Sequence, residues 1–298
     1  MKKIIVILGP TASGKTDLAV KLAKKFGGEV VSADSRQVYK GMDIGTAKVT
    51  KKERQGIPHY LLDVASPKRR FTVTQYRNLA SIAINKIFKR EKLPILCGGT
   101  GFYIQAIVDG IIIPEVKPDW KLRKKLEKKS NKELYKILKK LDPKRARKID
   151  KENPRRLIRA IEIVLKTKKP IPSFQKKPKF SALFIGIRKS PEELKKSIKI
   201  RFLKWLKQGL IKEVKNLRKI GFSWKKIEEF GIHYRVVAQY LQKKMDYKTM
   251  VENSLIEIQN YAKRQMTWFK RDRRIHWIHP HTKKGFRKVI KLCKEFLL

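Results

Sequence analysis

The segment GPTASGKT at residues 9–16 constrains the fold of this chain more than any other, and it directly follows the apolar run at residues 4–8. A glycine, four further residues and then Gly-Lys-Thr is the spacing at which backbone N–H groups wrap phosphate oxygens, while the hydroxyl can bind Mg²⁺. The segment also joins a predicted strand to a predicted helix, as this motif requires. The sequence therefore predicts a phosphate-binding loop formed by Gly9, Thr11, Ala12, Ser13, Gly14, Lys15 and Thr16, with Thr16 as the metal ligand, and the phosphates could belong to a nucleotide or to a diphosphate leaving group.

Strand-like apolar runs alternate with helix-like segments over the first 114 residues, the pattern of a parallel sheet with crossover helices. We expect strands at residues 4–8, 29–32, 94–97, 182–187 and 274–278, and helices at residues 16–26 and 74–88. Two polar segments, residues 34–37 and 98–101, follow predicted strand ends, as the phosphate loop does. Ligands of open α/β sheets bind at this edge, so the three segments should surround one site.

Residues 115–178 are different in character, with short, highly charged helices punctuated by prolines and no predicted strand. We expect them to form an inserted helical subdomain. Residues 1–114 and 179–298 would then make a discontinuous catalytic core. The expected fold class is α/β, a P-loop parallel sheet flanked by helices, with the all-helical subdomain inserted.

The chain has 75 lysines and arginines against 26 acidic residues, a formal net charge of +49, which favours nucleic acid as a partner. A lysine-biased proteome is the alternative, because lysine then fills solvated helix faces without binding anything. One predicted helix, beginning at Asn153-Pro154, is more informative, since its apolar stripe leaves Arg155, Arg156 and Arg159 on the opposite face. Three guanidinium groups there suit contacts with an RNA backbone, and an ordinary solvated face is the other interpretation.

Other features argue against several classes of protein. Cys97 and Cys293 are the only cysteines, which fits neither a structural zinc site nor a disulfide framework. No apolar stretch approaches the roughly 20 residues that cross a bilayer. We expect a protein that does not bind membranes, and we expect it to be a cytoplasmic monomer.

Asp34 is the carboxylate that most needs an explanation. P-loop ATPases carry an acidic residue at the end of an apolar strand, where it positions Mg²⁺. The predicted strand at residues 94–97 ends instead in Gly-Gly-Thr-Gly, and Asp34, at the end of the strand before it, is the nearest candidate. Metal binding and general-base catalysis therefore compete for one carboxylate, and a helix cap is a third possibility.

Five segments together resemble the tRNA dimethylallyltransferase (isopentenyltransferase) family, over nearly the whole chain. They are GPTASGKT at 9–16, SADSRQVYKGMDIGTAK at 32–48, PILCGGTGFYIQAIVDG at 94–110, NPRRLIRAIE at 153–162 and YAKRQMTWFKRD at 261–272. The resemblance implies transfer of a dimethylallyl group from dimethylallyl diphosphate to N6 of the adenosine 3′ of the anticodon in tRNA, with Mg²⁺. The loop would then hold a leaving diphosphate, and no ATP would be needed. The absence of a C-terminal zinc finger favours a bacterial type of enzyme.

The resemblance also assigns roles by position. Asp34 matches the general base, Thr100 a threonine beside the reacting groups, and Arg201 an arginine near the diphosphate, which makes these three the expected catalytic residues. Residues that match the family's tRNA-contacting stretches are Asp34, Ser35, Arg36 and Gln37, and Arg155, Arg156, Leu157, Ile158 and Arg159. The chain departs from the family pattern at Arg155, where glutamine is usual, and at residues 231–235.

The residues suit this chemistry on independent grounds. An exocyclic adenine amine is a poor nucleophile, so the site must stabilise departing diphosphate, which Lys15 and the metal at Thr16 can do, and remove a proton, which Asp34 can do. Two rivals remain. A P-loop kinase of a small molecule or nucleoside would use Asp34 as its base and turn over ATP without RNA. A non-catalytic binding protein would bind tRNA without any transfer.

Overall fold

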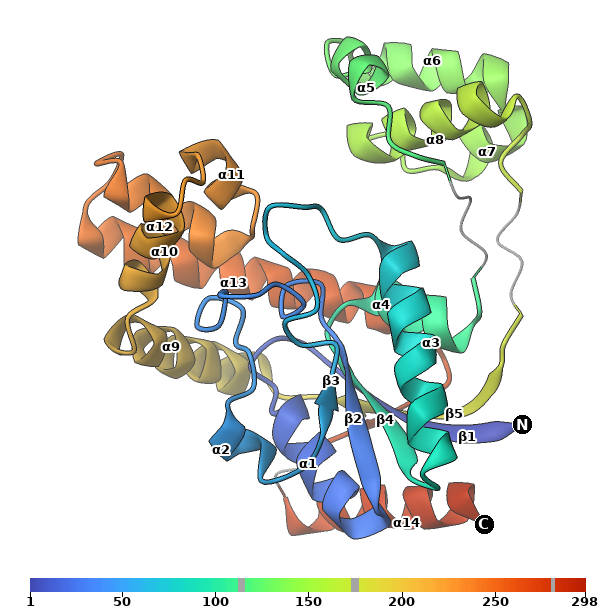
Figure 1. The fold of residues 1–298 in the computed structure, drawn as a ribbon, viewed down its shortest axis with the longest axis vertical. Helices are drawn as coiled ribbons and strands as arrows, with labels where there is room; N and C mark the ends of the chain where they lie inside the picture. Colours follow the sequence, from blue (N-terminus) through green and yellow to red (C-terminus); the bar gives the residue numbers. More distant parts are fainter. Residues whose placement is uncertain (112–115, 173–176, 280–281) are drawn as a thin grey trace. The chain divides into compact units, whose positions relative to one another are not determined.

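The computed structural model describes residues 1–111, 116–172, 177–279 and 282–298. These residues form two compact units, one made of Met1–Asp109 and Pro178–Leu298 and the other of Gly110–Lys177 (Figure 1). The boundary that we predicted between residues 114 and 115 lies outside the described residues. Among the described helices, none combines the length and the apolar composition needed to cross a membrane.

The first unit is built on a six-stranded sheet in which every described pairing is parallel. Its strands in spatial order are β3 (His59–Tyr60), β2 (Gly28–Ala33), β4 (Leu93–Gly98), β1 (Lys2–Leu8), β5 (Phe180–Ile187) and β6 (Ile275–Ile278). The predicted α/β class with a parallel sheet is confirmed. The two-residue strand β3 was not predicted, because two residues are too few to show an alternating or apolar pattern.

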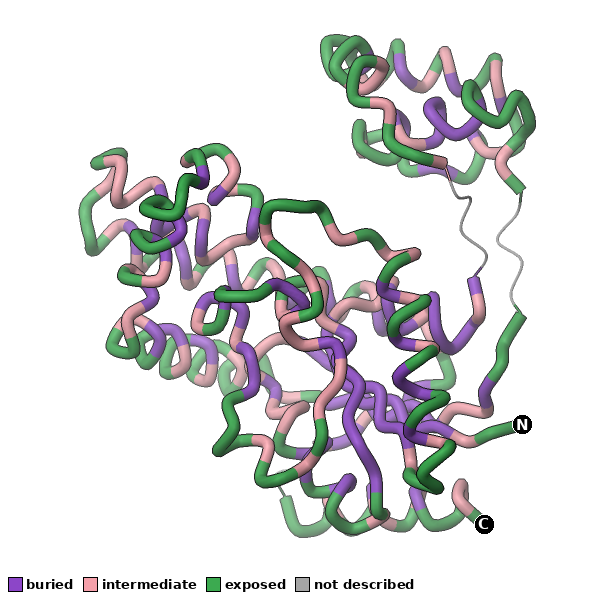
Figure 2. The backbone as a smooth tube through the Cα atoms, viewed as in Figure 1, coloured by how far each residue is buried: buried purple, intermediate pink, exposed green. Residues whose placement is uncertain are grey.

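Strand β1 lies in the middle of the sheet and is buried on both faces. Ile4, Val6 and Leu8 pack on one face with α3 (Val73–Lys89) and α4 (Gly101–Val108). Ile5 and Ile7 pack on the other with α1 (Lys15–Phe26) and α14 (Lys283–Leu297). A parallel strand covered on both sides needs a continuous apolar run, which explains the residues that precede the phosphate loop. Figure 2 shows the buried strands of the sheet as a continuous purple layer.

A second hydrophobic cluster joins five helices of this unit to a loop that follows β2. The helices are α9 (Pro191–Lys207), α10 (Leu210–Lys219), α11 (Trp224–Glu228), α12 (Ile232–Leu241) and α13 (Tyr247–Phe269). From the loop, Val38, Tyr39 and Met42 enter the same cluster. The short helix α2 (Lys51–Arg54) follows this loop and begins with a capping box at Thr50. This packing brings residues far along the chain to the carboxyl edge of the sheet.

The second unit contains α5 (Trp120–Leu126), α6 (Asn131–Leu141), α7 (Pro143–Lys148) and α8 (Pro154–Thr167). Its core includes Leu134 and Leu138 of α6 and Leu157 and Ile161 of α8, all without exposed surface. As predicted, α8 begins after Asn153, whose side chain accepts a hydrogen bond from the Arg156 backbone N–H at 3.2 Å.

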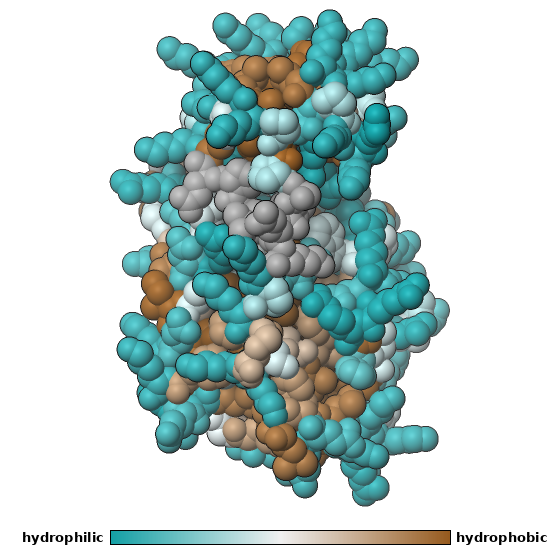
Figure 3. Space-filling model, turned by 90° about the vertical axis from the view of Figure 1, so that its right-hand side faces the viewer, coloured by the Kyte–Doolittle hydropathy of each residue, from teal (hydrophilic) through white to brown (hydrophobic). Residues whose placement is uncertain are grey.

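Hydrophilic side chains cover most of the molecular face drawn in Figure 3, in keeping with the large excess of lysine.

Candidate functional site

The phosphate loop turns tightly between β1 and α1. Gly9 and Gly14 have φ values of +150° and +93°, which favour glycine, and a Cβ on Gly9 would stand 2.9 Å from the Ile187 carbonyl oxygen of β5. Because α1 begins at Lys15, the loop lies at the positive end of that helix. The local sequence thus builds an anion-binding loop with the geometry that the motif predicts.

A cavity of about 750 Å³ opens over this loop. Asp34 and Gln37 line it after β2, Gly98 and Gly99 line it after β4, and residues 43–44 and 46–50 form a further wall. From α9 and the segment before it come Lys189, Ser197, Arg201, Lys204 and Trp205. The predicted strand-end segments therefore meet at one site, as expected for the carboxyl edge of a parallel sheet.

Two partly buried cations face the phosphate loop. Lys15 donates a hydrogen bond to the Pro10 carbonyl oxygen at 2.7 Å, and loss of water around the ammonium lowers its pKa to about 8. The Arg201 guanidinium donates to the Thr11 hydroxyl and lies 4.7 Å from the centroid of the Trp205 ring. Desolvation lowers the pKa of Arg201 to about 10, although the charge of Asp34 opposes the shift. A bound anion would supply the countercharge that both groups lack.

Lys189 adds a third cation that the sequence analysis did not single out. It follows the end of β5, and its Nζ lies 3.0 Å from the Ser197 hydroxyl and 3.5 Å from the Ala12 carbonyl oxygen of the phosphate loop. The signal was present in the sequence, because a basic residue just after a predicted parallel strand is placed at the binding edge of the sheet.

On the other side of the cavity, Asp34 has one engaged oxygen. Its Oδ1 accepts hydrogen bonds from the backbone N–H groups of Arg36 at 2.8 Å and Gln37 at 3.3 Å, so the carboxylate caps a turn. Oδ2 has no hydrogen-bond partner among the residues that the structure describes. The capping interpretation therefore accounts for one oxygen, and the other is available to a ligand.

Thr100 is held directly beside this turn. Its hydroxyl accepts a hydrogen bond from the Ser35 backbone N–H at 3.1 Å, and its own N–H donates to the Ala33 carbonyl oxygen at 3.1 Å. The approach is close because Gly98 has no side chain, since a Cβ there would stand 2.2 Å from the same carbonyl oxygen. Thr100 and Asp34 are thus parts of one packed corner, formed by the ends of β2 and β4.

The ligands for a divalent metal ion would be few. No group of three or more histidine, cysteine or acidic side chains suited to a metal occurs in the described part of the chain. The Thr16 hydroxyl and the Asp34 carboxylate both line the cavity. One or two protein oxygens, completed by phosphate oxygens and water, form the kind of site that Mg²⁺ occupies, so these residues fit such an ion.

A sequence model of the IPP transferase family matches residues 37–272. The chain belongs to this family. It is 41% identical over 306 residues to the tRNA dimethylallyltransferase of Acetivibrio thermocellus, covering 100% of this chain and 98% of the relative. It is also 41% identical to the tRNA dimethylallyltransferase of Halothermothrix orenii, over 99% of this chain and 94% of the relative.

Solved structures agree with the IPP transferase assignment. The tRNA isopentenylpyrophosphate transferase of Bacillus halodurans superposes with a TM-score of 0.76 and 33% identity, over 100% of this chain and 97% of that one. A eukaryotic dimethylallyltransferase described as acting on tRNA superposes with a TM-score of 0.85 and 28% identity, over 100% of this chain and 80% of that one. The similarity therefore extends over the whole chain.

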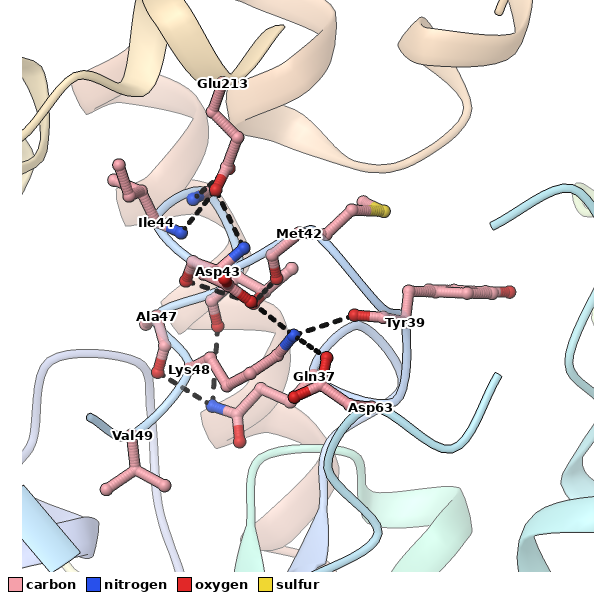
Figure 4. A network of polar contacts seen from close by, with 12 residues as sticks. Gln37, Tyr39, Met42, Asp43, Ile44, Ala47, Lys48, Val49, Asp63 and Glu213 are labelled. Atoms are coloured by element: carbon pink, nitrogen blue, oxygen red, sulfur yellow. Dashed lines mark hydrogen bonds and ion pairs between the residues drawn. The ribbon is translucent and has the colours of Figure 1, made fainter. Parts of the chain in front are cut away.

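In this IPP transferase, the loop after β2 is held rigidly by polar contacts (Figure 4). Lys48 Nζ donates to the Tyr39 carbonyl oxygen at 2.8 Å and pairs with Asp43 at 2.6 Å and Asp63 at 2.5 Å. Glu213 of α10 accepts hydrogen bonds from three consecutive backbone N–H groups, those of residues 43, 44 and 45, at 2.8 to 2.9 Å. The wall of the cavity that this loop forms is therefore fixed from both sides.

The candidate tRNA-binding residues near the cavity are held differently from one another. The Arg36 side chain is exposed, whereas Ser35 is half-buried and donates to Thr100. Gln37 is also half-buried, and its amide donates to the Ala47 carbonyl oxygen at 2.9 Å. Arg36 is therefore the member of this segment best placed to reach a large ligand.

In the second unit, the predicted arginine face is smaller than expected. Arg155 and Arg156 are exposed, but Arg159 pairs with Glu162, which has no exposed surface, and donates to the Val116 carbonyl oxygen at 3.0 Å. Leu157 and Ile158 are buried in the helical core. Arg159 lies at the edge of the buried stripe of α8. A helical wheel shows this position, but it does not show that the buried carboxylate of Glu162, one turn away, forms an ion pair with Arg159. Of the five predicted tRNA-binding residues at positions 155–159, two therefore present an exposed guanidinium group.

Proposed function

We propose that this chain transfers the dimethylallyl group of dimethylallyl diphosphate to N6 of the adenosine on the 3′ side of the anticodon in tRNA, giving N6-isopentenyladenosine and diphosphate. One observation carries the proposal: a single cavity joins a cationic phosphate loop to a carboxylate with an available oxygen. Relatives that align over the full chain are named tRNA dimethylallyltransferase, which supports the same reaction.

The donor diphosphate would lie on the phosphate loop. Backbone N–H groups at the start of α1 would bind its oxygens, and Lys15, Arg201 and Lys189 would supply positive charge. When the bond between the dimethylallyl C1 and the diphosphate oxygen breaks, negative charge grows on the leaving group. Cations and dipoles that are already in place stabilise that charge without reorganisation, which lowers the barrier.

Thr16 would hold a divalent cation, for which we propose Mg²⁺. Its hydroxyl lines the cavity at the start of α1, beside the place where the diphosphate oxygens would bind. The cation would add its charge to that of Lys15 and Arg201 around the leaving diphosphate.

Asp34 would serve as the general base. The N6 amine forms its bond to C1 as the C1–O bond breaks, and one N6 proton passes to the open Oδ2 of Asp34. General-base assistance of this kind contributes about 10²–10⁴-fold to rate. Thr100, held beside Asp34 by the Ser35 N–H, would orient the adenine amine. Because that base lies in an anticodon loop, it must be extruded from its stack to enter the cavity.

Contacts with the rest of the tRNA would come from both units. Arg36 lies on the turn that holds Asp34, and with Ser35 and Gln37 it would contact the nucleotides around the target. Arg155 and Arg156 would bind the RNA backbone, while Leu157, Ile158 and Arg159 support their helix from within. We further propose that one chain suffices as a monomer, because the donor and acceptor ends share one cavity, and that it acts on tRNA in the cytoplasm.

A direct assay tests this function. The protein is incubated with dimethylallyl diphosphate, Mg²⁺ and unmodified tRNA, and the tRNA nucleosides are then analysed by mass. A mass increase confined to the adenosine 3′ of the anticodon is expected, and a tRNA with another base at that position is the control. ATP consumption without RNA would favour a kinase instead, and tRNA binding without transfer would indicate a binding protein.

A further inference from the structure

Gln265 of α13 connects two parts of the cavity that are far apart in the sequence. The residue is only 7% exposed. The amide oxygen Oε1 accepts a hydrogen bond from the Thr11 backbone N–H at 2.8 Å, and the amide nitrogen Nε2 donates to the Gly99 carbonyl oxygen at 2.9 Å. Both ends of one buried amide are therefore used, one on the phosphate loop and one on the turn after β4.

Each of these contacts reaches a residue of the proposed reaction. At the donor end, Thr11 also receives the Arg201 guanidinium on its hydroxyl. At the acceptor end, Gly99 immediately precedes Thr100, whose hydroxyl holds the Ser35 N–H beside Asp34. Hydrogen bonds, joined by the covalent links within Thr11 and between Gly99 and Thr100, thus connect the diphosphate side of the cavity through Gln265 to the side of the general base.

The turn after β4 is shaped for this amide. A Cβ on Gly99 would stand 2.3 Å from Gln265 Nε2, a distance at which one of the two must move. The φ angle of Gly99 is not positive, so its backbone conformation does not require glycine. A glycine is needed at this position because a side chain would occupy the space taken by Gln265. The two residues are therefore matched to each other.

We infer that Gln265 is a positioning residue that sets the distance between the donor diphosphate and the acceptor base. The inference rests on the proposed transferase function. Bond formation between two bound substrates needs reacting atoms about 3–3.5 Å apart, and a misplacement of about 1 Å can reduce the rate about 10²-fold. An amide that donates at one end and accepts at the other can hold both sides of the cavity, whereas a group that only accepts cannot.

The substitution Gln265→Glu tests this requirement with a pH profile. A protonated carboxyl can accept from the Thr11 N–H and donate to the Gly99 carbonyl, so it reproduces both contacts. An ionised carboxylate only accepts, and it would face the Gly99 oxygen without a proton. Burial beside a bound diphosphate raises the pKa of such a carboxyl toward neutrality. We expect kcat for transfer, divided by the wild-type kcat at the same pH, to be at least about tenfold higher at pH 6 than at pH 8.5.

Two variants serve as controls. Gln208→Glu adds the same carboxyl at an exposed position of the cavity, so its ratio to wild type should not change over this pH range. Gln265→Met keeps the shape but makes neither contact, and we expect a loss of kcat of about 10-fold or more at every pH. Circular dichroism at pH 6 and pH 8.5 checks that the folded fraction of each variant is unchanged.

A flat ratio for a folded Gln265→Glu would overturn the inference, as would a Gln265→Met enzyme with the wild-type kcat. If neither variant folds, Gly99→Ala displaces the amide from the opposite side, and its kcat should fall while donor affinity changes less than threefold. Wild-type activity in the same assay separates the two proposals. A wild-type protein without transfer activity refutes the proposed function, whereas an active wild type with a flat ratio for Gln265→Glu, or with a fully active Gln265→Met, refutes only the role of Gln265.

Discussion

The Arg201 guanidinium of α9 donates a hydrogen bond to the Thr11 hydroxyl of the phosphate loop, across 190 residues of the chain. The same group lies 4.7 Å from the centroid of the Trp205 ring, one turn further along the helix. These two contacts hold a planar, permanently charged group against the loop before any anion binds. The orientation of the guanidinium, as well as its charge, is therefore part of the site.

Arg201→Lys keeps the charge but loses the planar fork and the contact with the Trp205 ring. We expect KM for dimethylallyl diphosphate to rise about 10-fold or more, which corresponds to about 1.4 kcal/mol, with KM for tRNA unchanged. Steady-state kinetics with each substrate varied in turn measures both values. Lys199→Met removes an exposed charge of the same helix that does not line the cavity, and it should change either KM less than threefold. Equal losses in the two variants would show that charge alone matters.

Affinity for the donor should depend on pH through Lys15. Its pKa is about 8 in the ligand-free cavity, and a bound diphosphate favours the ammonium form and raises that pKa. Below pH 8 the ammonium is present before and after binding, so Lys15 adds no pH dependence. Above pH 8 binding must take up a proton, so the Kd should rise about tenfold for each pH unit.

Calorimetric titration of dimethylallyl diphosphate into the protein from pH 7 to pH 9.5 measures this slope. Lys15→Met is the matched control. The diphosphate of the donor gains and loses protons identically in both experiments, but the variant has no lysine at this position to titrate. Its affinity should be weaker and its slope smaller than that of wild type. Identical slopes in the two proteins would mean that Lys15 stays protonated throughout.

Asp34→Asn keeps the shape of the side chain but loses its negative charge. If Asp34 is the general base, the single-turnover rate of transfer should fall about 10²-fold or more. Donor affinity should survive. Both quantities are measured at two Mg²⁺ concentrations in rapid-mixing experiments. A carboxylate that mainly organised the metal would instead lower donor affinity, and its loss would be partly rescued by raised Mg²⁺. Rescue by raised Mg²⁺ would contradict the assignment of Asp34 as the general base.

The exposed arginines of α8 should contribute to tRNA affinity by electrostatics. Reversing the charge of Arg155 and Arg156 together should weaken tRNA binding and lower the slope of log Kd against log salt by about 0.7 to 0.9 for each lost phosphate contact. Filter binding at several salt concentrations gives that slope. Charge reversal of Lys132 and Lys136, which are exposed on α6 of the same unit, is the control for net charge. Arg159 is left intact because it neutralises the buried Glu162.

Local patterns were sufficient to predict much of this fold. The apolar run of β1, the glycine spacing after it and the cap at Asn153 are short-range signals, and each of these features lies where the sequence predicted it. The positions of Asp34 and of the turn after β4 followed from one rule, that parallel strands bring their carboxyl ends to one edge.

The contacts that complete the cavity could not be predicted in the same way. Gln265 lies in a segment dominated by basic and aromatic residues, and its hydrogen-bond partners are 254 and 166 residues away in the sequence. Glu162 breaks the apolar pattern of α8, but Arg123, which pairs with it at 2.6 Å, comes from another helix. Periodicity reports which face of an element is buried and not which distant side chain will meet it.

The position of β1 between β4 and β5 has a consequence for synthesis on the ribosome. Chain order places the helical unit Gly110–Lys177 between the two neighbours of β1, and β6 comes later still. While the chain emerges, β1 can pair with β4 early, but its other edge exposes unpaired backbone groups until residues 180–187 appear. The helical unit has a hydrophobic core of its own and can fold during that interval. Vectorial synthesis thus produces a half-finished sheet with an open edge, which is the state most exposed to aggregation or to chaperone binding.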